Sequence, residues 1–132
     1  PHGSWAFVNP NASDAGFTVQ GLILHWDGVA WSAVESPAAG YATILLGVTA
    51  KSSADVTTVG YIQTKSVQYI PLTEHWNGTK WTVVKAPNPG RVGQLYGTDA
   101  TLAGTWAVGA YSTLPMTQGY MENPSTLVMK NR

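Results

Sequence analysis

The chain carries the stretch HWDGVAW at residues 25–31 and repeats it almost unchanged as HWNGTKW at residues 75–81. Aligning residues 25–40 with 75–90 gives seven identities in sixteen positions, and a fainter third register sets Trp5 against Trp106. A period of about 50 residues is typical of helical solenoids and of propeller blades. The secondary structure inside one repeat therefore decides the fold.

Each copy contains a dipeptide typical of a tight β-hairpin, Asp27-Gly28 in the first and Asn77-Gly78 in the second. A two-residue type I′ turn places both of its central residues at positive φ. Such a turn would set Trp26 opposite Val29 and would keep Trp26 and Trp31 on one face of the sheet. No segment holds an apolar 3.6-residue period for ten residues, so we expect strands rather than helices.

The complete central repeat predicts four strands joined as an antiparallel meander. They are expected over residues 45–50, 55–61, 72–77 and 80–84, and the next repeat adds strands over 95–99 and 105–111. Apolar residues on both faces of these strands favour a blade packed between two neighbours. We therefore predict an all-β fold, a partial β-propeller of about two and a half four-stranded blades. It forms a single module over residues 1–132, divided into a partial blade at 1–40, a complete blade at 41–90 and a partial blade at 91–132.

The number of strands is too small for a closed ring. The first repeat lacks an innermost strand before Trp5, and the last one lacks the tryptophan hairpin and the outer strand. An open stack would leave apolar faces and strand edges in water. We therefore predict closure by homo-oligomerisation, with a dimer as the first choice and a trimer as the next.

Composition and charge exclude several classes of function. The chain has 7 Lys and Arg against 7 Asp and Glu, without a basic cluster, so we expect neither a nucleic-acid nor a membrane partner. It has no cysteine, which excludes disulfides, thiolate chemistry and cysteine-based zinc sites. His25 and His75 are repeat-equivalent and lack further ligands at a suitable spacing, so we expect no metal and no cofactor.

The repeat also resembles a known family. Its pattern Leu-x-x-His-Trp-(Asp/Asn)-Gly-x-x-Trp-x-x-Val-x-x-Pro resembles the blade repeat of bacterial β-propeller proteins, and its Trp-Asp-Gly-x-x-Trp kernel is similar to that of small propeller lectins assembled from short chains. The resemblance covers nearly the whole chain and implies glycan binding and an extracytoplasmic or secreted location. Fucose-binding members typically carry a Glu just before the turn, where this chain has Ile23 and Thr73, so fucose recognition in that mode is not implied.

We expect the binding residues where the repeats differ, because shared positions serve the scaffold and loops on one rim carry specificity. The connections at residues 9–18, 62–71 and 110–125 differ most. Their amide groups beside aromatic rings suit a neutral polyol better than a phosphate. The candidate ligand-binding residues are Asn9, Asn11, Asp14, Phe17, Gln63, Tyr69, Glu74, Tyr111, Gln118, Tyr120 and Glu122.

Glu74 stands apart from the other candidates. It occupies the Trp-bearing face of its strand, where the first repeat has Leu24 and the third has Met129. A carboxylate in such a place must be hydrated, paired or bound. Two interpretations stay open, a ligand group between blades and a group that faces a seam near the rim.

We expect a non-catalytic module that binds carbohydrate through the rim loops of an oligomeric propeller. The alternative is a protein-interaction or assembly scaffold without sugar binding. A glycosidase is a third possibility, since Asp14, Glu35 and Glu122 lie on the predicted rim. Nothing in the sequence fixes a separation suited to an acid and a base, so we expect no catalytic residues.

Overall fold

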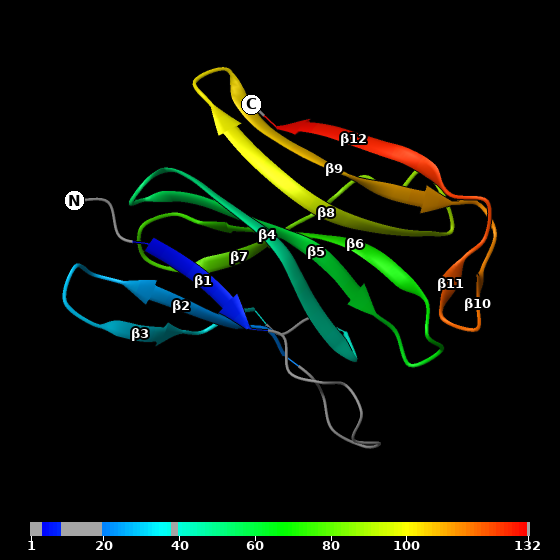
Figure 1. Cartoon of the computed structure of the whole chain (residues 1–132), viewed down its shortest axis with the longest axis horizontal. Helices are drawn as coiled ribbons and strands as arrows, with labels where there is room; N and C mark the ends of the chain where they lie inside the picture. Colours follow the sequence, from blue (N-terminus) through cyan, green and yellow to red (C-terminus); the bar gives the residue numbers. More distant parts are fainter. Residues whose placement is uncertain (1–3, 9–19, 38–39, 132) are drawn as a thin grey trace.

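The computed structural model describes residues 4–8, 20–37 and 40–131, and this part of the chain forms strands and no helix (Figure 1). The all-β prediction is confirmed. No helix in these residues is long and apolar enough to cross a membrane. The twelve strands of the described residues are β1 (Ser4–Val8), β2 (Leu22–Trp26), β3 (Trp31–Val34), β4 (Ala42–Ser52), β5 (Asp55–Gln63), β6 (Tyr69–Trp76), β7 (Trp81–Val84), β8 (Val92–Thr101), β9 (Gly104–Ser112), β10 (Met116–Thr117), β11 (Tyr120–Met121) and β12 (Ser125–Asn131).

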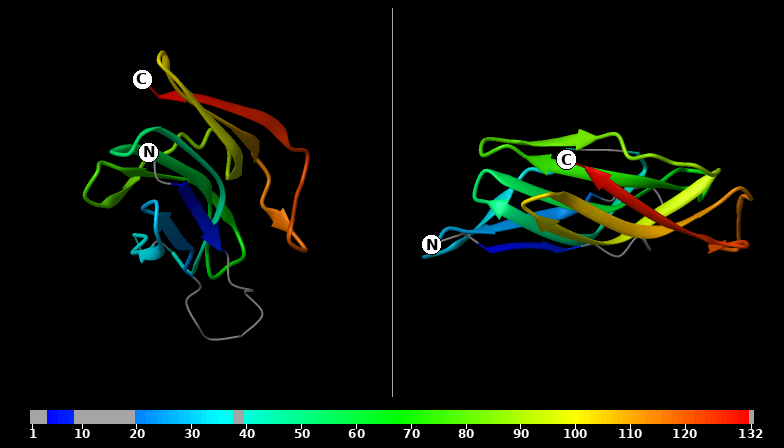
Figure 2. Two further views of the ribbon diagram at one scale, coloured as in Figure 1. Left: turned by 60° about the vertical axis from the view of Figure 1, so that its left-hand side comes forward. Right: turned by 90° about the horizontal axis from the view of Figure 1, so that it is seen from above.

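The longer strands form three antiparallel sheets that follow one another along the chain. The first sheet has the order β1-β2-β3, the central sheet β4-β5-β6-β7 and the third sheet β8-β9-β12, while β10 and β11 form a small hairpin between β9 and β12. The central sheet is the predicted four-stranded meander. It lies between the other two sheets in Figure 1 and in the left view of Figure 2.

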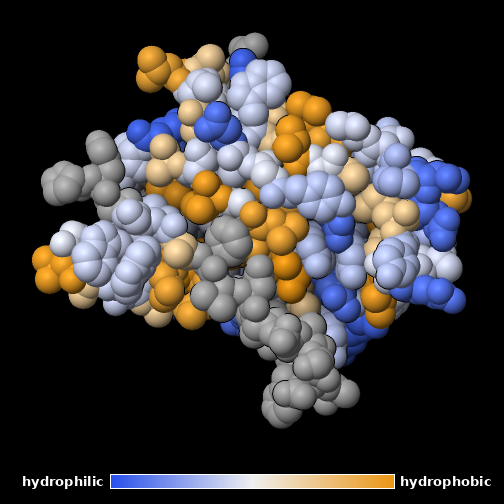
Figure 3. Space-filling view, viewed as in Figure 1, coloured by the Kyte–Doolittle hydropathy of each residue, from blue (hydrophilic) through white to orange (hydrophobic). Residues whose placement is uncertain are grey.

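Both faces of the central sheet are covered by apolar side chains. The cluster between the first and central sheets consists of Ile23, Leu45, Val56, Leu72 and Trp81. The cluster between the central and third sheets consists of Val59, Leu95, Ala107 and Leu127. Alternate residues of one strand point to opposite faces, so β5 sends Val56 into one cluster and Val59 into the other. Figure 3 shows hydrophobic residues across the middle of the molecule and more hydrophilic ones toward the end that carries β10 and β11.

The tryptophan hairpins have a different register from the one predicted. Trp26 pairs with Trp31 and not with Val29, so the loop holds four residues rather than two. The cause is the Asp27 carboxylate, which accepts hydrogen bonds of 2.8 and 2.9 Å from two amides of its own loop. Only Gly28 of the loop has a positive φ. The second copy repeats this arrangement, and the two tryptophans of each hairpin still share one face.

Gly60 marks a place where two strands leave no room for a side chain. It lies on β5 opposite Leu45, beside a bulge of β4, and a Cβ there would overlap the backbone oxygen of Ile44. We expect Gly60→Ala to lower the free energy of unfolding by about 2 kcal/mol or more. Gly97→Ala is the control, because its Cβ would have no neighbour nearer than 3.8 Å. Urea unfolding of both variants measures the difference, and equal losses would contradict this packing.

Candidate functional site

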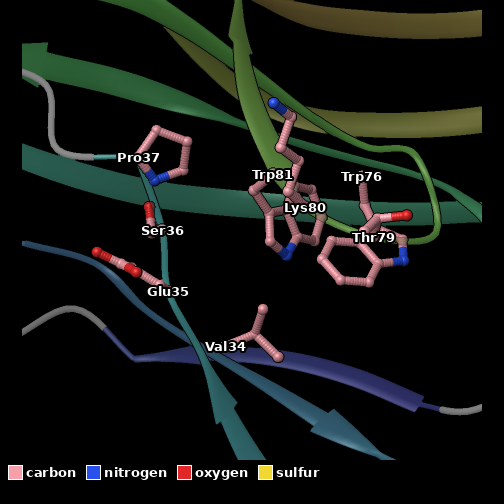
Figure 4. Close-up of a pocket in the computed structure, with 8 residues that line it drawn as sticks. All are labelled: Val34, Glu35, Ser36, Pro37, Trp76, Thr79, Lys80 and Trp81. Carbon is pink, nitrogen blue, oxygen red and sulfur yellow. The ribbon is translucent and has the colours of Figure 1, made fainter.

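A pocket of about 300 Å³ opens between the first and central sheets. One wall is the end of β3 with the residues that follow it, and the other is the β6–β7 hairpin (Figure 4). Its volume lies at the lower end of the range typical of small-ligand sites. The lining residues are Val34, Glu35, Ser36, Pro37, Trp76, Thr79, Lys80 and Trp81.

Indole rings form the hairpin wall of the pocket. Trp76 and Trp81 face each other across β6 and β7, with ring centroids 5.9 Å apart. Trp5 of β1 packs against both rings at 5.4 and 5.2 Å, and the ring of His25 lies 4.4 Å from that of Trp5. This aromatic cluster fixes the hairpin against the first sheet and so sets the width of the pocket.

The indole N–H of Trp81 has no hydrogen-bond partner among the described residues, although its Nε1 atom is buried. Figure 4 shows this nitrogen on the edge of the ring that faces the space between the hairpin and Val34. A buried donor without a partner costs about 1–3 kcal/mol. An acceptor oxygen of a bound molecule would remove that cost.

Glu74 lies fully buried behind the pocket. The Ser36 hydroxyl, which lines the pocket, donates to the Glu74 carboxylate and lies 3.1 and 3.2 Å from its two oxygens. Burial raises the pKa of Glu74 to about 7, and the hydroxyls of Ser36 and Thr58 act in the opposite direction. Glu74 is therefore a carboxyl group that changes its charge near neutral pH.

The strand register confirms that Glu74 replaces an apolar residue of the other repeats. Glu74 pairs with Thr58 across β5 and β6. The matching pairs are Leu24 with Ala6 in the first sheet and Met129 with Ala107 in the third. The central sheet thus has a polar pair where its neighbours have apolar ones.

The serine that contacts Glu74 also stands where the other repeat has an apolar residue. Ser36 aligns with Ala86 in the second repeat, and Ala86 packs against the apolar cluster between the central and third sheets. Met129 packs there too. The polar group Ser36, Thr58 and Glu74 at one interface therefore corresponds to the apolar group Ala86, Ala107 and Met129 at the other.

The ligand-binding candidates of the rim loops that the structure describes are not among the residues that line this pocket, whereas Glu35, which the sequence also placed on the rim, does line it. Gln63 and Tyr69 are cross-strand partners where β5 and β6 meet, and the Tyr69 ring lies 4.5 Å from that of Tyr61. Tyr111 lies in β9, and three further candidates lie in or beside the β10–β11 hairpin. Those three are Gln118, Tyr120 and Glu122.

Two of the predicted rim connections do meet. The Gln68 side-chain oxygen accepts a hydrogen bond of 3.0 Å from the amide of Met116, which joins the β5–β6 connection to β10.

Four other candidates lie outside the described residues. These are Asn9, Asn11, Asp14 and Phe17.

A larger hollow of about 500 Å³ lies between the central and third sheets. Lys85 lines it at the position that Glu35 has in the first pocket, and Lys130 and Met129 line the side of β12. The charged residues that line this hollow are therefore two lysines, whereas the first pocket has one carboxylate and one lysine. No group of three or more His, Cys, Asp or Glu side chains suited to a metal occurs in the described part of the chain.

Comparisons of the chain with protein families, with curated proteins and with solved structures give no match. The functional argument therefore rests on the chemistry of the site.

Glu74 makes the stability of the fold depend on pH. Its pKa is about 7 when folded against an ordinary value of 4.5, so the folded state binds the extra proton and stability falls as the pH rises from about 4.5 to 7. We expect Glu74→Gln to unfold at about the same free energy as the parent near pH 4 and to be more stable at pH 8, by roughly 3 kcal/mol at most.

Urea unfolding across this pH range measures the effect. Glu35→Gln is the matched control, because Glu35 lines the pocket but is exposed, and its curve should follow that of the parent. Parallel curves for Glu74→Gln and the parent would show that Glu74 is not a buried acid.

Proposed function

We propose that this chain is a non-catalytic carbohydrate-binding module, and that its sugar site is the pocket between the first and central sheets. We also propose that the three sheets are successive blades of a β-propeller. Two observations support the blades: the central meander has four strands, and the sheets follow one another in chain order with their apolar faces in contact.

The observation that carries the proposal is the buried indole N–H of Trp81, which has no partner in the part of the chain that the structure describes and lies at an indole-lined pocket. The apolar face of a sugar ring packs well on an indole such as Trp76, while its hydroxyls need donors and acceptors. Lys80 supplies a donor, Glu35 an acceptor and Ser36 both. The opposite charges of Glu35 and Lys80 favour a neutral polyol over an anion.

The state of Glu74 favours binding over catalysis. Hydrolysis of a glycosidic bond by the usual route needs two carboxyl groups that flank that bond. Glu74 is fully buried, and both of its oxygens lie near the Ser36 hydroxyl. It therefore serves the pocket through Ser36 and does not flank a ligand.

An assembly scaffold without sugar binding is the second candidate. It is favoured by exposed apolar side chains on the outward faces of the first and third sheets. These are Leu22 and Trp31 on the first sheet and Trp106, Val108 and Val128 on the third.

A glycan array tests the proposal. We expect the parent chain to give signals for neutral glycans, and we expect Glu35→Ala and Lys80→Ala to weaken binding of the best ligand about tenfold or more, because each removes a charged hydrogen-bonding group. Tyr120→Ala on the rim and Lys85→Ala in the second hollow should bind as the parent does.

All four residues are exposed, so these variants should fold, and their circular dichroism spectra check this. Loss of binding in Tyr120→Ala alone would move the site to the rim loops. An array without signals for the folded parent would favour the scaffold.

A further inference from the structure

We propose that the outward face of the third sheet in one copy docks on the outward face of the first sheet in another copy, as the first sheet docks on the central sheet within one chain. The occupant of each open face is thus a second copy of this protein. The proposal does not depend on sugar binding. It rests on an interface inside the chain that serves as its template.

The template is the contact between the first and central sheets. On the first sheet, Trp5 and His25 are cross-strand partners with stacked rings. On the central sheet, Trp76 and Trp81 are cross-strand partners at the hairpin. The Trp5 ring packs on both of these indoles, at 5.4 and 5.2 Å. One stacked pair therefore covers one pair of tryptophans.

The third sheet presents a similar stacked pair to solvent. Trp106 and Lys130 are cross-strand partners on β9 and β12, as Trp5 and His25 are on β1 and β2. The Lys130 ammonium lies 5.2 Å from the centre of the Trp106 ring, and that ring is exposed. The Trp106 face, defined here by Trp106, Val108, Val128 and Lys130, thus matches the covering face of the first sheet.

A comparison of equivalent residues shows that the Trp106 face has no partner among the residues that the structure describes. Val128 lies at the strand position that Ile23 has in the first sheet, two residues before Lys130 as Ile23 is two before His25. Ile23 is 1% exposed because the central sheet covers it, whereas Val128 is 57% exposed. Val108 beside it is also exposed.

The first sheet presents the matching pair of tryptophans on its own outward side. Trp26 and Trp31 are cross-strand partners with ring centroids 5.6 Å apart, close to the 5.9 Å of Trp76 and Trp81. We define the Trp31 face by Leu22, Trp26 and Trp31. It points away from the central sheet, because Ile23 on the opposite side joins the cluster between the sheets.

Leu22 and Trp31 of the Trp31 face are exposed, whereas the equivalent residues of the central sheet are buried. Trp31 is 50% exposed and Trp81 is 5% exposed. Leu22 is 41% exposed and the equivalent Leu72 is 1% exposed. The tryptophan hairpins of the two sheets therefore share one pattern, but only the hairpin of the central sheet is covered by a stacked pair. An exposed apolar face of this kind marks an interaction site.

The two faces differ from each other, so the contact is head-to-tail. An interface of this type closes into a ring when the rotation allows and otherwise extends as a chain of copies. Lys130 adds a further attraction, because its ammonium would lie against the indoles of the Trp31 face. In a two-fold contact each face would pack on its own copy, so the Trp106 face would not meet the tryptophan pair of the Trp31 face.

Two variants test the arrangement. Trp31→Lys alters the Trp31 face and Val128→Lys alters the Trp106 face, at side chains exposed in one chain, so each variant should fold. We expect the parent to form assemblies in sedimentation velocity and each variant to be a monomer. Val29→Lys, at an exposed loop position, is the charge-matched control and should assemble as the parent does.

An equal mixture of the two variants gives the deciding result. Each variant keeps the face that the other has lost, so the mixture should form a complex of two copies and nothing larger. A monomeric parent, a variant that assembles alone, or a mixture that stays monomeric would each overturn the proposal. The glycan pocket lies within one chain, so sugar binding by the monomeric variants is measured separately and stands or fails independently.

Discussion

The packing of one aromatic pair on another holds the first sheet against the central sheet. Trp5 on the first sheet contacts both Trp76 and Trp81 on the central sheet, and an apolar cluster extends from this contact along the interface. A sheet with two apolar faces is stable only when both faces are covered. The central sheet meets this condition, whereas the first and third sheets each have one covered and one open face.

The polar group between the first and central sheets is not required by packing. At the equivalent place between the central and third sheets, the chain uses alanine and methionine, and these residues pack into the core. Glu74 and the indole N–H of Trp81 instead leave, at one interface, a buried acid and a donor that finds no partner among the residues described. Groups that cost stability while an apolar solution exists in the same chain point to a function at that interface.

The sequence predicts the strands well because hydrophobic alternation and turn residues are local signals. It also places Glu74 correctly against its apolar counterparts, since the repeat supplies the alignment. It misses the hairpin register, because the Asp27 side chain bonds to its own loop. It misses the pocket, because both repeats have a tryptophan at this position, Trp31 and Trp81, and shared positions are expected to serve the scaffold. The difference between Ser36 and Ala86 was the available signal.

The contact between the aromatic pairs is the claim on which the fold and the pocket both depend. Nuclear Overhauser effects among the tryptophan side chains measure it directly in solution. The account predicts cross-peaks from the Trp5 ring to the rings of both Trp76 and Trp81, together with a slowly exchanging Trp81 indole proton. Absence of the Trp5 cross-peaks in the folded protein would contradict it.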